Sequence, residues 1–209
     1  MKYKAIVLDF DGTIVESTDI KDKAFRELFK GYPQHLDKIM EYHLSNNATI
    51  RYDKFKYITE KILGVEYTEQ IRNKLSGEFS RQVFERIANA SYVPGAIEFL
   101  DYFYGKTPMF IVSMSPAAEL EEIIKKRCLE KYFKRIYAYP WLKKDAIEDI
   151  IKNEKVCEGE VVFIGDTLQD YKAALLSGVH FIGRKSDRPL DGKGVVACKD
   201  FAGIKSRIY

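Results

Sequence analysis

The sequence predicts an α/β protein: a doubly wound parallel sheet with an inserted all-helical domain. Three observations support this fold class. Short apolar runs of strand-like composition alternate with helical patterns through the second half of the chain, which is typical of a parallel sheet covered by helices on both faces. One further run of this kind lies near the N-terminus. Between that run and the others, residues 16–92 show only helical periodicity, as expected of an insertion.

Apolar runs rich in β-branched or aromatic residues predict the buried strands. They are residues 5–10, 109–114, 135–139, 161–165 and 180–183. Helical patterns separate the later runs at residues 117–128, 144–153 and 168–177. The last pattern stops at Gly178, a typical residue after a helix C-terminus. Strands that alternate with helices are joined by right-handed crossovers, so we expect parallel strands.

The helical stretch after the first strand predicts a second domain. Residues 16–92 form this domain, and residues 1–15 and 93–209 form the core domain. The candidate helices of the insertion are residues 20–29, 36–44, 52–63 and 68–90. The chain re-enters the core near Pro94, which suits the first turn of a helix.

The composition is that of an ordinary globular protein. The 209 residues are 46% hydrophobic and 31% charged, with 34 basic and 31 acidic residues and a formal charge of +3. Such a chain can bury a substantial core. Because no basic stripe or tail is present, the sequence gives no indication of a nucleic-acid partner.

The cysteines and the apolar runs indicate the compartment. Cys128, Cys157 and Cys198 lie far apart without metal-binding spacing, so we expect buried thiols in a reducing environment. The first apolar run is short and ends in acidic residues, unlike a signal peptide. No stretch approaches the ~20 apolar residues that cross a bilayer. We therefore expect a soluble, cytoplasmic protein with no membrane partner.

Acidic residues follow two of the predicted strands. Asp9 and Asp11 come at the end of the first strand, and Asp166 comes at the end of the fourth, with Asp170 in the first turn of the next helix. Open parallel sheets bind ligands at the carboxyl ends of their strands. If these two strands are neighbours, four carboxylates meet there, which is unfavourable unless a cation is held between them. Carboxylate oxygens in a compact site suit Mg²⁺.

Other polar residues complete this region. Gly12 permits a tight turn after Asp11, and Thr13 can hydrogen-bond locally to hold it. Ser113 ends the second strand before a helix N-terminus that could receive an anion, although Ser113 or Ser115 could instead cap that helix. Lys143 and Lys144 begin another helix, where a cation needs an anionic partner because it opposes the helix dipole.

The four motifs resemble those of the haloacid dehalogenase superfamily. They are "DFDGT" at residues 9–13, the serine at the end of the second strand, a lysine before a helix, and "GDTLQD" at residues 165–170, in this order. The helical insertion resembles the caps of the phosphoglycolate-phosphatase-like branch. The usual proline after the lysine is missing, and the spacing to Ile147 favours Lys143 over Lys144 without excluding the latter.

The resemblance implies a division of labour among the carboxylates. Asp9 would attack phosphorus to form an aspartyl-phosphate. Asp11 would protonate the leaving alcohol and then activate water. Asp9, the Asp11 backbone carbonyl and Asp166 would hold Mg²⁺, with Asp170 nearby through water or lysine.

The resemblance also implies which groups hold the phosphate. Ser113, the motif lysine and Thr13 would bind the phosphoryl oxygens. Specificity would reside in the cap, where Arg51 and Lys54 lie three residues apart on one helix face and could meet an acidic substrate. The expected partner is a small phosphorylated metabolite; its identity and the oligomeric state stay open.

The sequence leaves three alternatives to a phosphatase. A phosphosugar mutase of the β-phosphoglucomutase type shares the nucleophile but returns the phosphoryl group to the substrate. A dehalogenase is disfavoured because it needs neither the second aspartate at position 11 nor a metal. A non-catalytic protein that binds a phosphorylated ligand is disfavoured because all four carboxylates are present.

Overall fold

The computed structural model describes residues 2–46, 49–186, 190 and 195–208, and the chain divides into two compact units. The α/β unit consists of Met1–Thr18 and Ala90–Tyr209, and the helical unit is Asp19–Asn89. The predicted insertion, residues 16–92, extends three residues further at each end than the helical unit. These extra residues belong to the α/β unit because Val15 pairs with Tyr92, and Glu16 N donates to Ser91 O over 2.9 Å.

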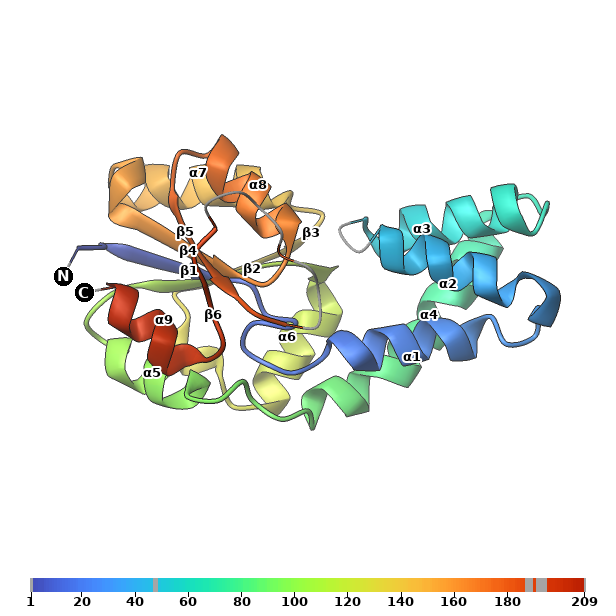
Figure 1. Cartoon of the computed structure of the whole chain (residues 1–209), viewed down its shortest axis with the longest axis horizontal. Helices are drawn as coiled ribbons and strands as arrows, with labels where there is room; N and C mark the ends of the chain where they lie inside the picture. The colour runs from blue at the N-terminus through green and yellow to red at the C-terminus, as the bar shows by residue number, and fades with distance from the viewer. Residues whose placement is uncertain (1, 47–48, 187–189, 191–194, 209) are drawn as a thin grey trace. The chain divides into compact units, whose positions relative to one another are not determined.

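The α/β unit is built on a parallel sheet of strand order β3-β2-β1-β4-β5-β6 (Figure 1). The strands are β1 (Ala5–Leu8), β2 (Met109–Pro116), β3 (Arg135–Tyr139), β4 (Val161–Gly165), β5 (His180–Arg184) and β6 (Ala197–Cys198). All neighbouring pairs run parallel. The predicted fold class and its predicted strands are confirmed. The strand β6 was not predicted, since its two residues are too few to show a period.

Helices cover both faces of this sheet, as a doubly wound fold requires (Figure 1). One face carries α7 (Lys143–Glu154) and α8 (Leu168–Leu176), and the other carries α5 (Ala96–Phe103), α6 (Ala117–Lys126) and α9 (Phe201–Ile208). The ring centroids of Phe99 in α5 and Phe201 in α9 are 4.8 Å apart. Short helices η3 (Glu130–Tyr132) and η4 (Glu158–Glu160) precede β3 and β4.

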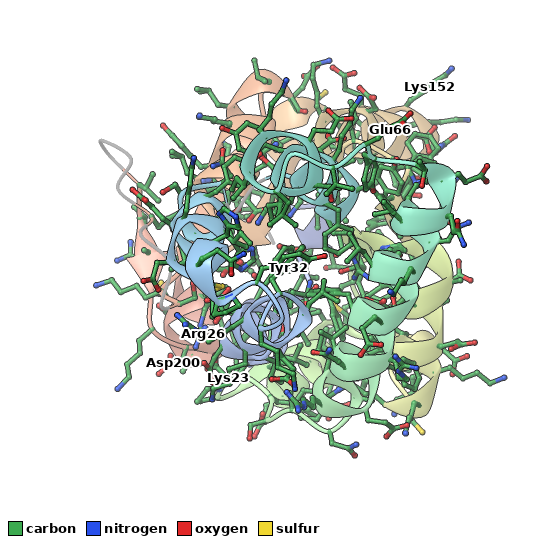
Figure 2. The ribbon with its side chains drawn as sticks, turned by 90° about the vertical axis from the view of Figure 1, so that its right-hand side faces the viewer. Lys23, Arg26, Tyr32, Glu66, Lys152 and Asp200 are labelled. Carbon is green, nitrogen blue, oxygen red and sulfur yellow. The ribbon has the colours of Figure 1, made fainter. Side chains whose placement is uncertain are left out.

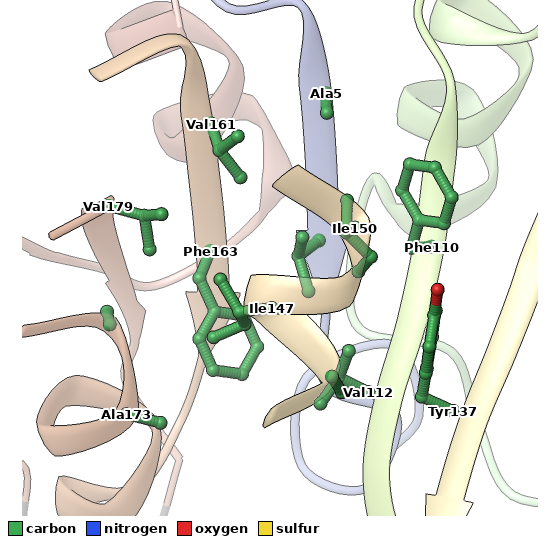
Figure 3. Packing of buried hydrophobic residues seen from close by; sticks show 13 residues of the cluster. Ala5, Phe110, Val112, Tyr137, Ile147, Ile150, Val161, Phe163, Ala173 and Val179 are labelled. Atoms are coloured by element: carbon green, nitrogen blue, oxygen red, sulfur yellow. The ribbon is translucent and has the colours of Figure 1, made fainter. Parts of the chain in front are cut away.

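A cluster of buried apolar residues lies between the sheet and the helices α7 and α8 (Figure 3). Alternate residues of β1, β2 and β4 face it, because successive side chains of a strand point to opposite faces. Ile147 and Ile150, three residues apart on α7, project toward these strand residues and are fully buried. The cluster includes Ala5, Val7, Phe110, Val112, Tyr137, Val161, Phe163, Ala173 and Val179.

Two expectations about this unit were wrong. Pro94 does not lie in the first turn of α5, because Gly95 is the N-cap in a left-handed conformation and the helix begins at Ala96. Only Cys198 is buried, whereas Cys128 and Cys157 are exposed. Both exposed cysteines lie at helix ends, Cys128 after α6 and Cys157 as the N-cap of η4, where the chain runs along the surface.

The helical unit has an aromatic core of its own. Its elements are α1 (Thr18–Leu28), η1 (Pro33–His35), α2 (Leu36–Ser45), α3 (Arg51–Tyr57), the π-helix η2 (Ile58–Ile62) and α4 (Glu69–Ala88). The Phe25 ring lies 5.0 Å from that of Phe79 and 5.5 Å from that of Phe55. Charged side chains such as Lys23 and Glu66 point outward (Figure 2). Among the described residues, no helix has both the length and the apolar character needed to span a membrane.

We predict that Ile147→Ala destabilises the α/β unit by about 2–5 kcal/mol, because it leaves a cavity among fully buried side chains. Leu175→Ala on α8 is the control, since Leu175 is 65% exposed and its truncation removes little buried surface. Urea unfolding of both variants measures the difference. Equal effects of the two substitutions would contradict the proposed position of the core.

Candidate active site

The candidate site lies where β1 and β4 end side by side. Leu8 pairs with Ile164, and Asp9 N donates to Ile164 O over 2.9 Å. Asp9 and Asp166 follow these two strands directly and therefore emerge at the same sheet edge. The connections from β1 run to β2 and β3 on one side, while β4 lies on the other side. This reversal is the switch point at which doubly wound sheets bind ligands.

Three buried carboxylates converge at this edge. Asp9, Asp166 and Asp170 each offer an oxygen within 4.8 Å of the others. Asp170 reaches the cluster from the first turn of α8, where its Oδ2 accepts from Thr167 N over 2.9 Å and from Thr167 Oγ1 over 2.6 Å. The fourth predicted carboxylate, that of Asp11, does not belong to this cluster.

The Asp11 carboxylate is held by two hydroxyl groups instead. Ser17 Oγ donates to Asp11 Oδ1 over 2.7 Å, and Ser115 Oγ donates to Asp11 Oδ2 over 2.9 Å. Ser17 comes from the segment before α1, and Ser115 comes from the end of β2. Ser17 was not among the predicted site residues, and Ser115 was predicted only as a possible helix cap. No local pattern reveals these contacts, because they depend on how β1 and β2 end.

Lys143 supplies the cation of the site. Its Nζ lies 3.0 Å from Asp9 Oδ2 and 2.5 Å from Asp170 Oδ1, and the side chain is buried at the start of α7. Lys144, the alternative, forms an ion pair with Glu148 on the surface of the same helix. The structure thus brings Lys143 into the carboxylate cluster and leaves Lys144 outside it.

Burial shifts the pKa values of these groups. Loss of hydration raises the pKa of Asp9 to about 7, with Lys143 opposing the shift and Asp170 and Asp11 adding to it. Burial, followed by the charges of Asp9 and Asp170, raises the pKa of Asp166 to about 8. Burial alone would lower the pKa of Lys143, but Asp170 and Asp9 outweigh it and raise that pKa.

The donor set fits a divalent cation. Three buried carboxylates face one ammonium group, so the cluster is short of positive charge. Asp166 Oδ2 is buried and has no hydrogen-bond partner among the described residues. An unpaired buried carboxylate oxygen is costly, and a hard cation would satisfy it.

Gly12 allows the loop after β1 to pack directly against Asp166. Its φ is +73°, and a Cβ atom there would lie 2.2 Å from Asp166 Oδ2. No other residue fits this position without moving the carboxylate. Thr13 is fully buried behind it, and its Oγ1 donates to Asp166 Oδ1 over 3.5 Å. Thr13 therefore contacts a distant strand end, rather than its own turn as expected from the sequence.

Ser113 lies in the last part of β2 and is buried. Its Oγ accepts a hydrogen bond from Ser115 N over 3.2 Å. Neither serine caps the following helix, because β2 continues to Pro116 and Pro116 is the N-cap of α6. The cap alternative considered for both serines was therefore wrong.

Arg51 and Lys54 belong to the packing of the helical unit. Lys54 is buried, its Nζ donates to His43 O over 3.2 Å, and it lies over the Phe25 ring. Arg51 Nη1 donates to Ser80 Oγ over 2.9 Å, and its guanidinium lies over the Phe79 ring. The expectation of two side chains on one face toward an acidic substrate needs correction, because Lys54 points into the aromatic core.

The fold and the site define a class of protein: a doubly wound α/β protein with a carboxylate cluster and a buried lysine at its switch point. The family model of haloacid dehalogenase-like hydrolases matches residues 6–184. The chain belongs to this family, as its motifs indicated. No curated protein matches the sequence.

Solved structures share the fold of this chain at low sequence identity. A predicted phosphoglycolate phosphatase from Haemophilus somnus has a TM-score of 0.81 at 16% identity, covering 100% of this chain and 99% of its own. YfnB from Bacillus subtilis, provisionally named a HAD-hydrolase and solved with magnesium, has a TM-score of 0.74 at 15% identity, with coverages of 100% and 99%. A provisionally named β-phosphoglucomutase from Thermotoga maritima has a TM-score of 0.71 at 19% identity, covering 98% of each chain.

We predict that Asp166→Asn stabilises the protein in EDTA at pH 8 by at least about 1 kcal/mol, or about 2–4 °C in Tm for a chain of this size. The Asp166 pKa of about 8 exceeds the ordinary value of 3.8, so the folded state holds this proton more tightly. The proton on Asp166 therefore contributes its full share of stability below about pH 4, and this contribution is lost as the pH rises through about 8. The gain from the substitution should therefore shrink as the pH falls.

Thermal unfolding at pH 5 and pH 8 measures this dependence. Asp37→Asn is the matched control, because Asp37 is exposed on α2 and lies in the other unit. An Asp166→Asn effect of the same size at both pH values would contradict the raised pKa of the buried Asp166 carboxyl group.

Proposed function

We propose that this protein is a Mg²⁺-dependent phosphatase that hydrolyses a small phosphomonoester through an aspartyl-phosphate on Asp9. The observation that carries the proposal is the cluster of three buried carboxylates with one buried lysine at the switch point. Such a cluster attracts a divalent cation and, beside it, the anionic oxygens of a phosphate group. Membership of a hydrolase family supports the same reading.

Asp9, Asp166 and the backbone carbonyl of Asp11 would hold the Mg²⁺ ion. When bound, the ion supplies positive charge that allows a carboxylate to approach an anionic phosphate. Asp170 is close to the same point, but both of its oxygens already accept hydrogen bonds, from Lys143 and from Thr167. We therefore assign Asp170 chiefly to positioning Lys143, while Asp166 Oδ2 remains available for the metal.

The chemistry rests on Asp9 and Asp11. An Asp9 carboxylate oxygen attacks phosphorus, a P–O bond forms, and the ester P–O bond to the leaving alcohol breaks. Asp11 gives its proton to that alcohol and then accepts a proton from the water that attacks phosphorus. This attack releases inorganic phosphate and restores the Asp9 carboxylate. The hydroxyls of Ser17 and Ser115 orient Asp11 for both steps.

Lys143 and Ser113 hold the phosphoryl oxygens. Phosphoryl transfer passes through a loose transition state with its charge spread over these oxygens, so fixed positive charge and positioned donors provide most of the catalysis. Lys143 is well suited to this role because its two carboxylate partners fix its ammonium group. Thr13 supports the site indirectly by donating to Asp166.

The helical unit would select the substrate. The chain inserts it directly after the loop that carries Asp11, so its movement is coupled by covalent connection to the site. The similar structure of YfnB is described as revealing an interdomain movement. The names of other similar structures point to phosphoglycolate and to a hexose phosphate as the first substrates to test.

The decisive experiment measures inorganic phosphate released from a panel of phosphorylated metabolites, with Mg²⁺ and with EDTA. We expect release from at least one compound with Mg²⁺ and none with EDTA. Conversion of glucose 1-phosphate to glucose 6-phosphate without phosphate release would favour the mutase instead. No release from any compound by folded, Mg²⁺-loaded protein would overturn the phosphatase.

We predict that Asp9→Asn lowers the rate of p-nitrophenyl phosphate hydrolysis by about 10⁴-fold or more, because it removes the nucleophile. The fold should survive, since the amide has nearly the same volume, and circular dichroism checks this. The exposed Asp37→Asn variant serves as control and should keep full activity. Retained turnover in folded Asp9→Asn protein would exclude Asp9 as the nucleophile.

We predict that Lys143→Met lowers kcat by about 10²–10³-fold, as expected for the loss of one charged donor to the transition state. Lys144→Met makes the same chemical change at the next residue but removes only a surface ion pair, so its kcat should stay within about twofold of wild type. Steady-state kinetics of the two variants give the comparison. Similar losses in both would remove Lys143 from the mechanism.

A further inference from the structure

The chain crosses between its two units at two places, which lie side by side in the α/β unit. The first crossing is residues 14–17 and the second is residues 90–93. Val15 pairs with Tyr92 in antiparallel fashion, and Val93 N donates to Ile14 O over 3.0 Å. Any movement of the helical unit must act on these two segments, because they are its covalent connections.

Arg184 anchors the first crossing. It lies at the end of β5 and is 6% exposed. Its Nη1 donates to Gly12 O over 3.0 Å and to Glu16 Oε2 over 2.9 Å, and its Nη2 pairs with Glu16 Oε1. The bidentate pair fixes both position and orientation, and a guanidinium group cannot escape burial by losing its proton. Glu16 is thereby tied to the sheet two residues before α1 begins.

Arg127 anchors the second crossing in a similar way. It is the C-cap of α6, the helix that follows β2. In the sheet, β2 lies on the other side of β1 from β5. Arg127 Nη2 donates to Ala90 O over 2.8 Å, and its guanidinium lies 4.1 Å from the centroid of the Tyr92 ring. A guanidinium over an aromatic face adds a cation–π attraction to the hydrogen bond. Each crossing therefore has its own arginine from the α/β unit.

These anchors matter because the first crossing is continuous with the candidate site. Gly12, whose carbonyl Arg184 binds, directly follows Asp11 and packs against Asp166 Oδ2. Ser17, at the other end of the crossing, donates to Asp11. A displacement of residues 14–17 would therefore move both Asp11 and Gly12, the residue that packs against Asp166.

We propose that Arg184 and Arg127 are positioning residues that hold the two crossings to the α/β unit. Movement of the helical unit is then absorbed beyond Ser17 and before Ala90, and it does not reach Asp11 or Asp166. This inference rests on the proposed function only in taking the helical unit to move during the reaction. The anchoring is a property of the free protein and can be measured without substrate.

Hydrogen–deuterium exchange of the full chain tests the anchoring. Arg184→Lys keeps the charge but loses the bidentate pair, and we expect exchange at residues 12–17 to accelerate about tenfold, as for the loss of a hydrogen bond between charged groups. Arg127→Lys should accelerate exchange at residues 90–93 instead. Arg135→Lys is the matched control: it alters a surface arginine paired with Asp149 and should leave both segments unchanged.

A second variant covers the case in which Arg184→Lys does not fold. Glu16→Gln keeps the Arg184 bond to Gly12 O and weakens only the ion pair, so it should accelerate the same segment to a smaller extent. Unchanged exchange at residues 12–17 in the folded variants would overturn the proposal. A uniform acceleration over the whole chain would also overturn it, since this would make the arginines general stabilisers.

Kinetics give an independent readout of positioning. In the active enzyme, Arg184→Lys should lower kcat for p-nitrophenyl phosphate with little change in KM, because the loop with Asp11 is less well held while the phosphate-binding groups are intact. Equal kcat for this variant and wild type would overturn the link to Asp11. A wild type that releases no phosphate would refute the proposed function, and the exchange result would still decide the anchoring.

Discussion

The burial of three carboxylates around one ammonium group is the constraint on which the rest of this structure depends. Asp9, Asp166 and Asp170 repel one another when ionised, and they would move apart if their positions were not fixed. They stay together because the strands and the helix that carry them are fixed by the packing of Phe163, Ile147 and their neighbours. The apolar core therefore supplies the free energy that holds an unfavourable charge arrangement in place.

Asp170 shows how local and tertiary roles combine in one side chain. Its Oδ2 completes the capping box of α8 with Thr167, and its Oδ1 binds Lys143 at the start of α7. The N-termini of both helices thus meet at a single carboxylate. A lysine opposes the dipole at a helix start, and here Asp170 and Asp9 compensate for that. The surface pair of Lys144 and Glu148 does nothing comparable, because solvent screens it.

The sequence was sufficient to predict the fold class and the strands that carry the site. Strand periodicity and the order of the motifs are local signals, and they placed Asp9, Asp166 and Asp170 at strand or helix ends, where the structure has them. The roles of Ser17, Ser115 and Arg184 could not be predicted in this way. Their partners lie on other elements, so only the assembled sheet brings the groups together.

The environment of Lys54 also could not be predicted from the sequence. A lysine in a helix is usually assigned to the solvent face, yet this one enters an aromatic core with His43 as its partner. Helix propensity and the charge pattern do not show that a buried lysine on one helix has its hydrogen-bond partner on another helix. The same limit explains why β6 escaped detection, since its two residues are defined only by pairing with β5.

An insertion placed directly after the loop of the proposed nucleophile creates a mechanical problem. The segment that leaves the site toward the helical unit also carries Asp11, so the site can keep its geometry only if that segment is restrained close to its origin. Arginine suits this task better than lysine because its planar group binds a carboxylate and a carbonyl together from a buried position. The Arg184 guanidinium binds the carbonyl of Gly12, the residue that packs against Asp166 in the carboxylate cluster. Arg184 thus connects the electrostatics of the site to the mechanics of the two-unit chain.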